Sequence, residues 1–180
     1  MLVCACWPGP SSAADFTRRY DDDIRAAVRK FWGGAPDWTW WKAQLYQESR
    51  LDPAAESAVG AAGLAQIMPA TWADISRQLG YGGVSPHVAK FAIAGGAYYM
   101  GQLRRIWTAD RSLMERHRLA QASYNAGTGH ILDAQEACHE ARLWDDIKPC
   151  LASVTGAENA RQTIDYVDRI AGWQAEMVRR

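Results

Sequence analysis

Apolar residues recur along the chain at the three- and four-residue spacing that is typical of amphipathic helices. The first run predicts a helix that a glycine pair at 33–34 ends, and its apolar positions are Phe16, Tyr20, Ile24, Val28 and Phe31. A second helix is expected to begin at Pro36-Asp37, with Asp37 as its N-cap. It should stop at Asp52-Pro53, because the residue before a proline resists the α conformation.

The rest of the chain continues this helical pattern. Residues 54–68 are rich in alanine and glycine and predict a loop that returns close to the second helix. Pro69 at a first helical position predicts a helix to about Leu79, which Gly80 ends. Because no β-hairpin signal is convincing, we expect an all-α domain without repeats or linkers. Further helices are expected over 85–106, 111–124, 130–138 and 157–178, the last with Ile164, Val167, Ile170 and Ala171 inward.

One charged residue interrupts the apolar face of the second helix. The spacing i, i+3, i+7, i+10 places on that face Trp38, Trp41, Leu45 and Glu48. Burying an unpaired carboxylate is costly, so such a group finds a partner or raises its pKa and takes up a proton. A carboxylic acid that stays protonated near neutral pH can donate to a leaving group. On position alone, the alternative is that Glu48 lies at the edge of the stripe and pairs with Arg50 or Lys42.

Composition and charge narrow the classes of function. The chain has 180 residues, the size of one ordinary domain, and its 48% apolar and 22% charged residues are typical of a globular protein. A net charge of zero argues against nucleic acid as the main partner, because phosphates select a basic surface. Nine tryptophans fit either a helical core or stacking on sugar rings. No apolar run approaches the length needed to span a membrane, so we expect no transmembrane segment.

The N-terminus and the cysteines bear on the compartment. Residues 1–14 are expected to form a separate tail, which is either a truncated leader, because VCAC at 3–6 resembles a lipoprotein cleavage site, or a disordered remnant. Cys138 and Cys150 are spaced to close a small loop. If oxidised, their bridge would contribute on the order of 3 kcal/mol and indicate an oxidising compartment. Two free thiols are the alternative.

Other chemistries lack their residue patterns. The four histidines show no paired metal spacing, and Cys138-His139 with Cys150 lacks a fourth zinc ligand. The aspartates at 21–23 lack the glycine and terminal glutamate of a calcium loop. Gly127-Thr-Gly129 is too short for a phosphate-binding fingerprint. Carboxylate chemistry remains, without a metal or cofactor.

Three blocks accompany Glu48 downstream: ESRLDPAAESAVGAAGLAQIMPATW, ASYNAGTGHI and QTIDYVDRI. In this order and spacing they resemble the lytic transglycosylases of the soluble (SLT) type, relatives of goose-type lysozyme, over residues 38–172. The resemblance implies a lysozyme-like helical domain over residues 15–180, with a substrate cleft and peptidoglycan glycan strands as its partner. It also implies a monomer in the periplasm or cell envelope, as a bacterial wall-remodelling enzyme or as a phage endolysin exported or released at lysis.

The resemblance assigns a role to single residues. Glu48 matches the family's single catalytic acid, Tyr124 with Asn125 matches the tyrosine that orients it and the adjoining asparagine, and Tyr166 matches a tyrosine facing the cleft. Gly60 and Gly63 should let the loop backbone pass close to substrate. As alternatives, Met68 and Tyr124 belong to the core and Gln66 caps a backbone group. The expected substrate-binding residues are Ser57, Gln66, Met68, Thr71, Tyr124, Asn125 and Tyr166.

The chain departs from the family pattern in two places. GLMQ reads GLAQ here, with Ala65 in the methionine position, and Glu-Thr-Arg reads Gln162-Thr163-Ile164, so the contacts at one sugar subsite are not assigned.

The family mechanism uses a single acid. Glu48 would protonate the oxygen between N-acetylmuramic acid and N-acetylglucosamine, then deprotonate the O6 hydroxyl, leaving a 1,6-anhydromuramoyl end. The alternatives are a goose-type muramidase that uses water, with Asp52 or Glu56 as a second base, and a non-catalytic peptidoglycan-binding module.

Overall fold

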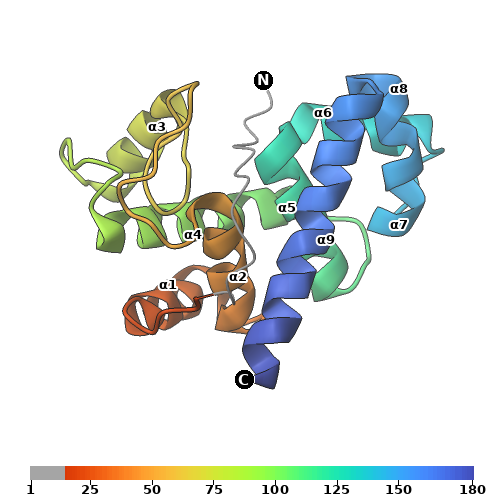
Figure 1. The fold of residues 1–180 in the computed structure, drawn as a ribbon. Coiled ribbons are helices and arrows are strands. Elements are labelled where there is room, and N and C mark those ends of the chain that lie inside the picture. The colour runs from red at the N-terminus through yellow and green to blue at the C-terminus, as the bar shows by residue number, and fades with distance from the viewer. Residues whose placement is uncertain (1–14) are drawn as a thin grey trace. The chain divides into compact units, whose positions relative to one another are not determined.

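The computed structural model describes residues 15–180, which form α-helices joined by loops and contain no β-strand (Figure 1). The predicted all-α class is therefore confirmed. The predicted tail of residues 1–14 lies outside the described residues. Within them, the chain divides into two compact units: an N-terminal unit of residues 15–99 and 170–180, and a central unit of residues 100–169. That residues 15–180 act as one domain stays a prediction.

The N-terminal unit begins with helices whose ends depend on local sequence. The three aspartates at 21–23 favour a helix start at Asp21, because acidic side chains complement the positive end of the helix dipole. This start is later than predicted, and Phe16 instead packs its ring 4.8 Å from that of Tyr46. Asp37 caps the second helix as predicted, its Oδ1 accepting from the Thr39 N–H at 3.0 Å. The helices are α1 (Asp21–Trp32), α2 (Trp38–Ser49) and α3 (Pro69–Leu79), with the first part of α4 (Ala89–Ile106) and the last part of α9 (Ala157–Arg179).

Tryptophans and a glycine pair form the core of this unit. A Cβ at Gly96 would lie 2.7 Å from the Trp41 ring, and one at Gly95 would lie 2.8 Å from the Trp72 ring. Only glycine therefore lets α4 come this close to α2 and α3. The Trp41 indole also donates to the Ile93 carbonyl at 3.2 Å. Trp41 and Trp72 therefore belong to the core, which is one of the two interpretations of the tryptophans.

The central unit contains short helices that the sequence pattern does not predict. Helix α5 starts at Leu113 because Ser112 is its N-cap, with the Glu115 N–H donating to the Ser112 hydroxyl at 3.2 Å. Gly127 alone, with φ of 89°, separates α5 from α6, so the predicted break over 125–129 is too long. The elements are α5 (Leu113–Ala126), α6 (Thr128–Ala137), α7 (Trp144–Ile147), the 3₁₀ turn η1 (Lys148–Cys150) and α8 (Leu151–Thr155), with parts of α4 and α9.

A disulfide joins Cys138, directly after α6, to Cys150 in η1, with a Cα–Cα distance of 5.8 Å. The bridged alternative is therefore the one that the structure contains, and both thiols are used by the bridge rather than by a metal. The bridge closes the segment that holds α7, which has only four residues.

Other boundaries differ from the predictions. Helix α2 ends at Ser49 because Arg50 and Leu51 both adopt the left-handed conformation. Helix α4 begins at Ala89 rather than near residue 85. On α9, Val167 and Ile170 are buried as predicted, whereas Ala171 is exposed.

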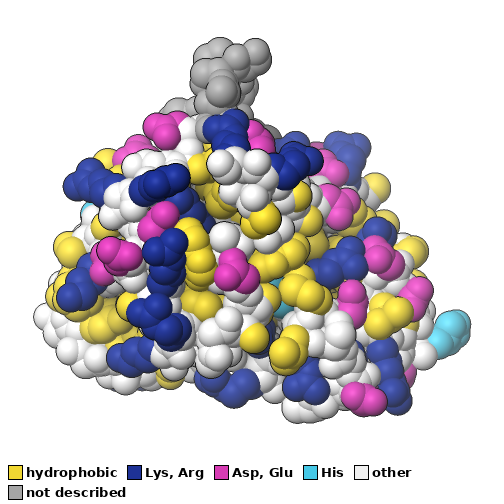
Figure 2. Space-filling view, turned by 90° about the horizontal axis from the view of Figure 1, so that it is seen from below, with side chains coloured by type: hydrophobic (Ala, Val, Ile, Leu, Met, Phe, Trp, Pro, Cys, Tyr) yellow, Lys and Arg dark blue, Asp and Glu magenta, His cyan; other side chains and the backbone are white. Residues whose placement is uncertain are grey.

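Charged side chains of both signs are interspersed on the face shown in Figure 2, as a net charge of zero leads one to expect. Over residues 15–180, no helix combines the length and the apolar character needed to cross a membrane.

Candidate active site

Glu48 is the last residue but one of α2 and is half-buried. Trp41 and Leu45, on the same face of the helix, are fully buried, whereas Trp38 is half-buried. Lys42, Gln44 and Tyr46 are buried too, so α2 is buried on most of its sides rather than along the single predicted stripe. The two cations that could neutralise it locally have other partners. Lys42 Nζ lies 2.6 Å from Asp21 Oδ1, and the Arg50 guanidinium lies 4.6 Å from the centre of the Tyr46 ring. Lys42 and Arg50 thus each have a contact with another side chain, and the pairing of Glu48 with one of them stays an alternative.

A hydrogen bond from Ser49 connects the following loop to the end of α2. The side chain of Ser49 is buried, and its hydroxyl donates to the Leu64 carbonyl at 2.9 Å, fifteen residues along the chain. Because Ser49 directly follows Glu48, this bond holds the loop of residues 51–68 beside the carboxyl-bearing turn. Sequence reasoning assigned no role to Ser49, although a serine directly after the candidate acid was a usable signal.

Hydrogen bonds within the loop hold two predicted sugar-binding residues. The Ser57 hydroxyl accepts from the Ala61 N–H at 2.9 Å, which leaves its own proton for another acceptor. Gln66 Nε2 donates to the carbonyls of Ala55 and Gly63, at 3.1 and 3.0 Å. The capping alternative for Gln66 is thus confirmed for the amide nitrogen, while the amide oxygen is left to accept from a ligand.

Position 63 requires a glycine because the Pro86 carbonyl lies directly against it. The φ of Gly63 is 72°, and a Cβ there would lie 2.0 Å from the Pro86 carbonyl oxygen. The close approach expected between Gly63 and substrate is thus an approach to the segment before α4. The imidazole of His87 supports the same arrangement, with Nδ1 2.9 Å from the Pro53 carbonyl oxygen. At Gly60, by contrast, a Cβ would be in ordinary contact with Pro69 at 3.7 Å.

Met68 and Thr71 lie where the loop becomes α3. Met68 is the N-cap residue, Pro69 is the first helical residue as predicted, and Thr71 follows in the first turn. Both Met68 and Thr71 are half-buried. The N-terminal unit thus carries its predicted site residues on the end of α2, the loop and the start of α3: Glu48, Ser57, Gln66, Met68 and Thr71.

The two acids considered as a second base differ from Glu48 in their surroundings. Asp52 Oδ1 accepts from the Ala54 N–H at 2.9 Å, so Asp52 shapes the turn before Pro53 as predicted. Glu56 is exposed, and its backbone pairs with that of Ala62. Neither carboxyl is sheltered from water.

The remaining predicted residues belong to the central unit. Tyr124 and Asn125 form the last turn of α5 and are half-buried, and Tyr166 on α9 is 3% exposed. The hydroxyl of the fully buried Thr163 donates to Asn125 Oδ1 at 2.9 Å and fixes this amide. Sequence reasoning noted the residues beside Thr163 as departures but gave Thr163 itself no role.

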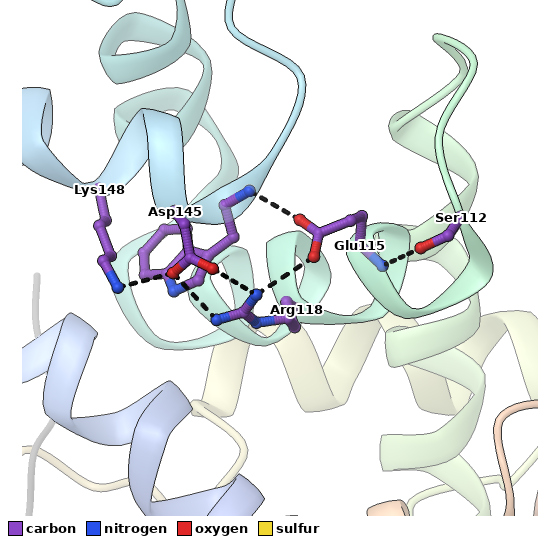
Figure 3. A network of polar contacts seen from close by, with 6 residues as sticks. Ser112, Glu115, Arg118, Asp145 and Lys148 are labelled. Atoms are coloured by element: carbon purple, nitrogen blue, oxygen red, sulfur yellow. Dashed lines mark hydrogen bonds and ion pairs between the residues drawn. The ribbon is translucent and has the colours of Figure 1, made fainter.

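A polar network elsewhere in the central unit joins α5 to α7 (Figure 3). Arg118 lies between Glu115, at 3.1 Å, and Asp145, at 3.0 Å. Bonds from Arg118 and Lys148 lower the pKa of Asp145 to about 2. Next to Arg118 in sequence, His117 is fully buried, and burial together with the charge of Arg104 lowers its pKa to about 3. His117 is therefore neutral at physiological pH.

The sequence matches a known protein family and several curated proteins. The family model of the transglycosylase SLT domain matches residues 36–146. The membrane-bound lytic murein transglycosylases F of Shewanella frigidimarina and Shewanella woodyi are 29% and 30% identical, over 87% and 91% of this chain. The chain spans about a third of the length of these curated relatives, 35% and 36% respectively.

Solved structures agree with the helical architecture. An inactive glutamate-to-glutamine mutant of lytic transglycosylase Slt from Pseudomonas aeruginosa matches with a TM-score of 0.69 and 25% identity, over 91% of this chain and 25% of that one. The 70-kDa soluble lytic transglycosylase of Escherichia coli matches with a TM-score of 0.67 and 22% identity, over 89% of this chain and 24% of that one. The second likeness concerns the fold alone.

Proposed function

The chain belongs to the transglycosylase SLT domain family, and from this premise we propose that it is a lytic transglycosylase that cleaves the glycan strands of peptidoglycan. One observation carries the proposal: half-buried Glu48 lies at the end of α2 directly before Ser49, whose hydroxyl holds the loop with Ser57 and Gln66 beside it. The names of the curated relatives, lytic murein transglycosylases, support the substrate. A glutamate-to-glutamine change is present in the inactive Pseudomonas aeruginosa enzyme.

In the proposed reaction Glu48 acts as acid and then as base. Its proton passes to the oxygen that joins C1 of N-acetylmuramic acid to N-acetylglucosamine, and the C1–O bond breaks while the muramoyl N-acetyl group stabilises the cationic centre. The ionised carboxylate then takes the proton of the O6 hydroxyl of the same sugar, and O6 bonds to C1. The proton lost by Glu48 is thereby restored and no water is consumed. General acid–base assistance of this kind is worth roughly 10²–10⁴ in rate.

The proposed binding residues supply sparse, directional hydrogen bonds to the glycan. On the N-terminal unit these are the Ser57 hydroxyl and the Gln66 amide oxygen, with Met68 and Thr71 beside them on the start of α3. On the central unit, the proposed glycan-binding residues are Tyr124, Asn125 and Tyr166. Thr163 holds the amide of Asn125 in place by a hydrogen bond.

The muramidase alternative gains no support, because Asp52 is used in a turn and Glu56 is exposed. We place the reaction in the cell envelope, where peptidoglycan lies. The protein acts there as a monomer, either as a bacterial wall-remodelling enzyme or as a phage endolysin.

The test is mass spectrometry of the muropeptides released from purified peptidoglycan by the wild-type protein and by Glu48→Gln. We expect 1,6-anhydromuramoyl ends from the wild type and a loss of at least about 10²-fold in the variant. Glu56→Gln, at an exposed carboxyl of the neighbouring loop, is the matched control and should release the same products as the wild type. Reducing ends would show that water is the nucleophile, and no release by either protein would leave only binding.

A further inference from the structure

The connection between α4 and α5 in the central unit contains hydrogen-bond donors that lack acceptors. Trp107 is 2% exposed, and its indole N–H is buried without a partner among residues 15–180. Within that range, three arginine nitrogens are also buried without a hydrogen-bond partner: Nε and Nη1 of Arg111 and Nε of Arg116. All four nitrogens can only donate. Because buried polar groups are nearly always satisfied, donors clustered within ten residues indicate that an acceptor belongs there.

These donors belong to a group of cations, which we call the arginine cluster: Arg104, Arg111, Arg116 and Arg142. The Arg111 guanidinium lies 5.5 Å from the centre of the Trp107 ring. Burial, followed by repulsion from Arg116 and Arg142, lowers the pKa of Arg111, and the charge of Glu115 opposes this effect only in part. Burial also lowers the pKa of Arg104, with repulsion from Arg105 and Arg116. A guanidinium keeps its proton at neutral pH, so this repulsion persists until an anion offsets it.

The acidic side chains nearby are engaged elsewhere. Glu115 accepts from Arg118 with one oxygen and from the Trp144 N–H, at 2.7 Å, with the other (Figure 3). Asp145 accepts from Arg118 and Lys148. Asp110 precedes Arg111 in sequence but is exposed. Among the described residues, none of these carboxylates accepts from the unpaired nitrogens of Arg111, Arg116 and Trp107.

We propose that the arginine cluster and Trp107 bind a phosphate group, carried by an anionic lipid headgroup or free in solution. The forked donors of arginine match phosphate oxygens in pairs. The terminal oxygens of phosphate accept hydrogen bonds, which the unpaired nitrogens of Arg111, Arg116 and Trp107 can donate. A phosphate monoester carries about −1.5 to −2 charges and so offsets more than one guanidinium, whereas a carboxylate offsets one. This site is separate in chemistry from Glu48 and goes beyond glycan cleavage.

The first experiment follows the tryptophan indole N–H resonances while inorganic phosphate is added to the full chain at constant ionic strength. Trp107→Phe identifies the Trp107 signal. We expect that signal to shift and saturate with phosphate but not with chloride, and Arg116→Gln to weaken phosphate binding about tenfold or more, as the loss of a charge-assisted bond implies. Arg161→Gln removes an exposed arginine that pairs with Glu158 in the same unit, and it should leave binding unchanged.

A second variant keeps the test decisive if Arg116→Gln fails to fold. Arg111→Gln removes two of the unsatisfied donors and should also weaken binding about tenfold. The proposal is overturned if the Trp107 signal does not respond, responds equally to chloride, or responds equally in the folded cluster variants. Because no glycan is present, failure of the cleavage reaction would not affect the result.

Vesicles identify the source of the phosphate group. Wild-type protein is sedimented with vesicles of phosphatidic acid, whose headgroup is a phosphate monoester, and with phosphatidylcholine vesicles, each with and without inorganic phosphate. Binding to the anionic vesicles that phosphate competes away, and that Arg116→Gln loses, assigns the site to a lipid headgroup. Saturable phosphate binding without vesicle binding assigns it to free phosphate. Vesicle binding that Arg116→Gln retains would contradict a lipid role for this cluster.

Discussion

The adjacent residues Glu48 and Ser49 have different roles: the first supplies the carboxyl, and the second positions the neighbouring loop. The half-buried side chain of Glu48 lies at the end of α2, while the hydroxyl of Ser49 donates to the Leu64 carbonyl and anchors the loop with Ser57 and Gln66. A small change in the loop would move its hydrogen-bonding groups relative to the carboxyl. Positioning errors of about 1 Å are known to cost roughly 10² in rate. The anchor is therefore expected to matter for turnover as well as stability.

Ser49→Ala tests this anchor. The variant leaves the Leu64 carbonyl without its buried donor, and we expect the free energy of unfolding to fall by about 1–2 kcal/mol. We also expect kcat/KM on purified peptidoglycan to fall, since the loop loses its link to α2. Urea denaturation and a muropeptide-release assay measure the two effects.

Ser153→Ala is the matched control for Ser49→Ala. The Ser153 hydroxyl also donates to a backbone carbonyl, that of Cys150 at 2.7 Å, but this bond is exposed and lies in the central unit. Water can replace an exposed donor, so we expect Ser153→Ala to change stability little and to leave kcat/KM unchanged. Equal values for the two variants would contradict the role given to Ser49.

Gly63 sets a second constraint on the same loop. Gly63→Ala places a Cβ 2.0 Å from the Pro86 carbonyl oxygen, at a φ of 72°, so both a clash and backbone strain oppose it. We expect a clear fall in Tm and a loss of free energy of unfolding greater than about 2 kcal/mol. Gly82→Ala carries only the strain, because nothing lies within 4 Å of a Cβ at that glycine, and it should cost about 1 kcal/mol. Similar melting curves for the two variants would show that the contact with Pro86 is not rigid.

At the scale of single elements, local signals explain which boundaries the sequence predicts. Helix α3 runs from Pro69 to Leu79 as expected, because a proline at its start and Gly80 after its end act through the backbone of their own turns. The end of α2 is missed, because the left-handed conformations of Arg50 and Leu51 carry no glycine or asparagine signal. Helix α7, of four residues, is too short to show a period.

The same distinction between local and distant contacts applies to the site. Glu48 is identified from the sequence mainly because the downstream blocks supply the resemblance. The expected stripe of α2 is a weaker signal, since Lys42, Gln44 and Tyr46 on its other sides are buried as well. The roles of Ser49 and Thr163 are not visible, because their partners Leu64 and Asn125 lie 15 and 38 residues away. Nothing in the local pattern of a serine or threonine specifies a partner at such a distance. The contact between Gly63 and Pro86 is hidden for the same reason.

The disulfide between Cys138 and Cys150 stabilises the element group α6, α7 and η1. It closes a loop in the unfolded chain, so the double variant Cys138→Ser and Cys150→Ser should lower the free energy of unfolding by about 3 kcal/mol. Guanidinium denaturation of the oxidised wild type and the double variant measures the difference. The wild type in reducing buffer should match the double variant. A wild type that is indifferent to reduction would indicate that the segment is held by its packing alone.

For the whole molecule, the dependence of stability on pH is set in large part by His117. Burial, with the charge of Arg104, lowers its pKa to about 3 in the folded state, whereas an unfolded histidine titrates near 6.5. Between these values the unfolded chain binds a proton that the folded chain does not. The free energy of unfolding therefore falls as pH falls below about 6.5, by up to about 1.4 kcal/mol per pH unit. Asp145, whose pKa is lowered to about 2, adds a loss in the same direction below about 3.8, small because its carboxylate is exposed.

Replacing the imidazole of His117 separates its effect on the free energy of unfolding at low pH from that of other groups. His117→Gln keeps a neutral polar side chain at the buried position but takes up no proton when the chain unfolds. Urea denaturation between pH 7 and pH 4 should show a steep decline of stability in the wild type and a shallower one in the variant. His139→Gln, at an exposed histidine of the same unit, should retain the wild-type slope. Equal slopes for the wild type and His117→Gln would show that His117 does not govern acid unfolding, which would then depend on the other groups that take up protons in this range.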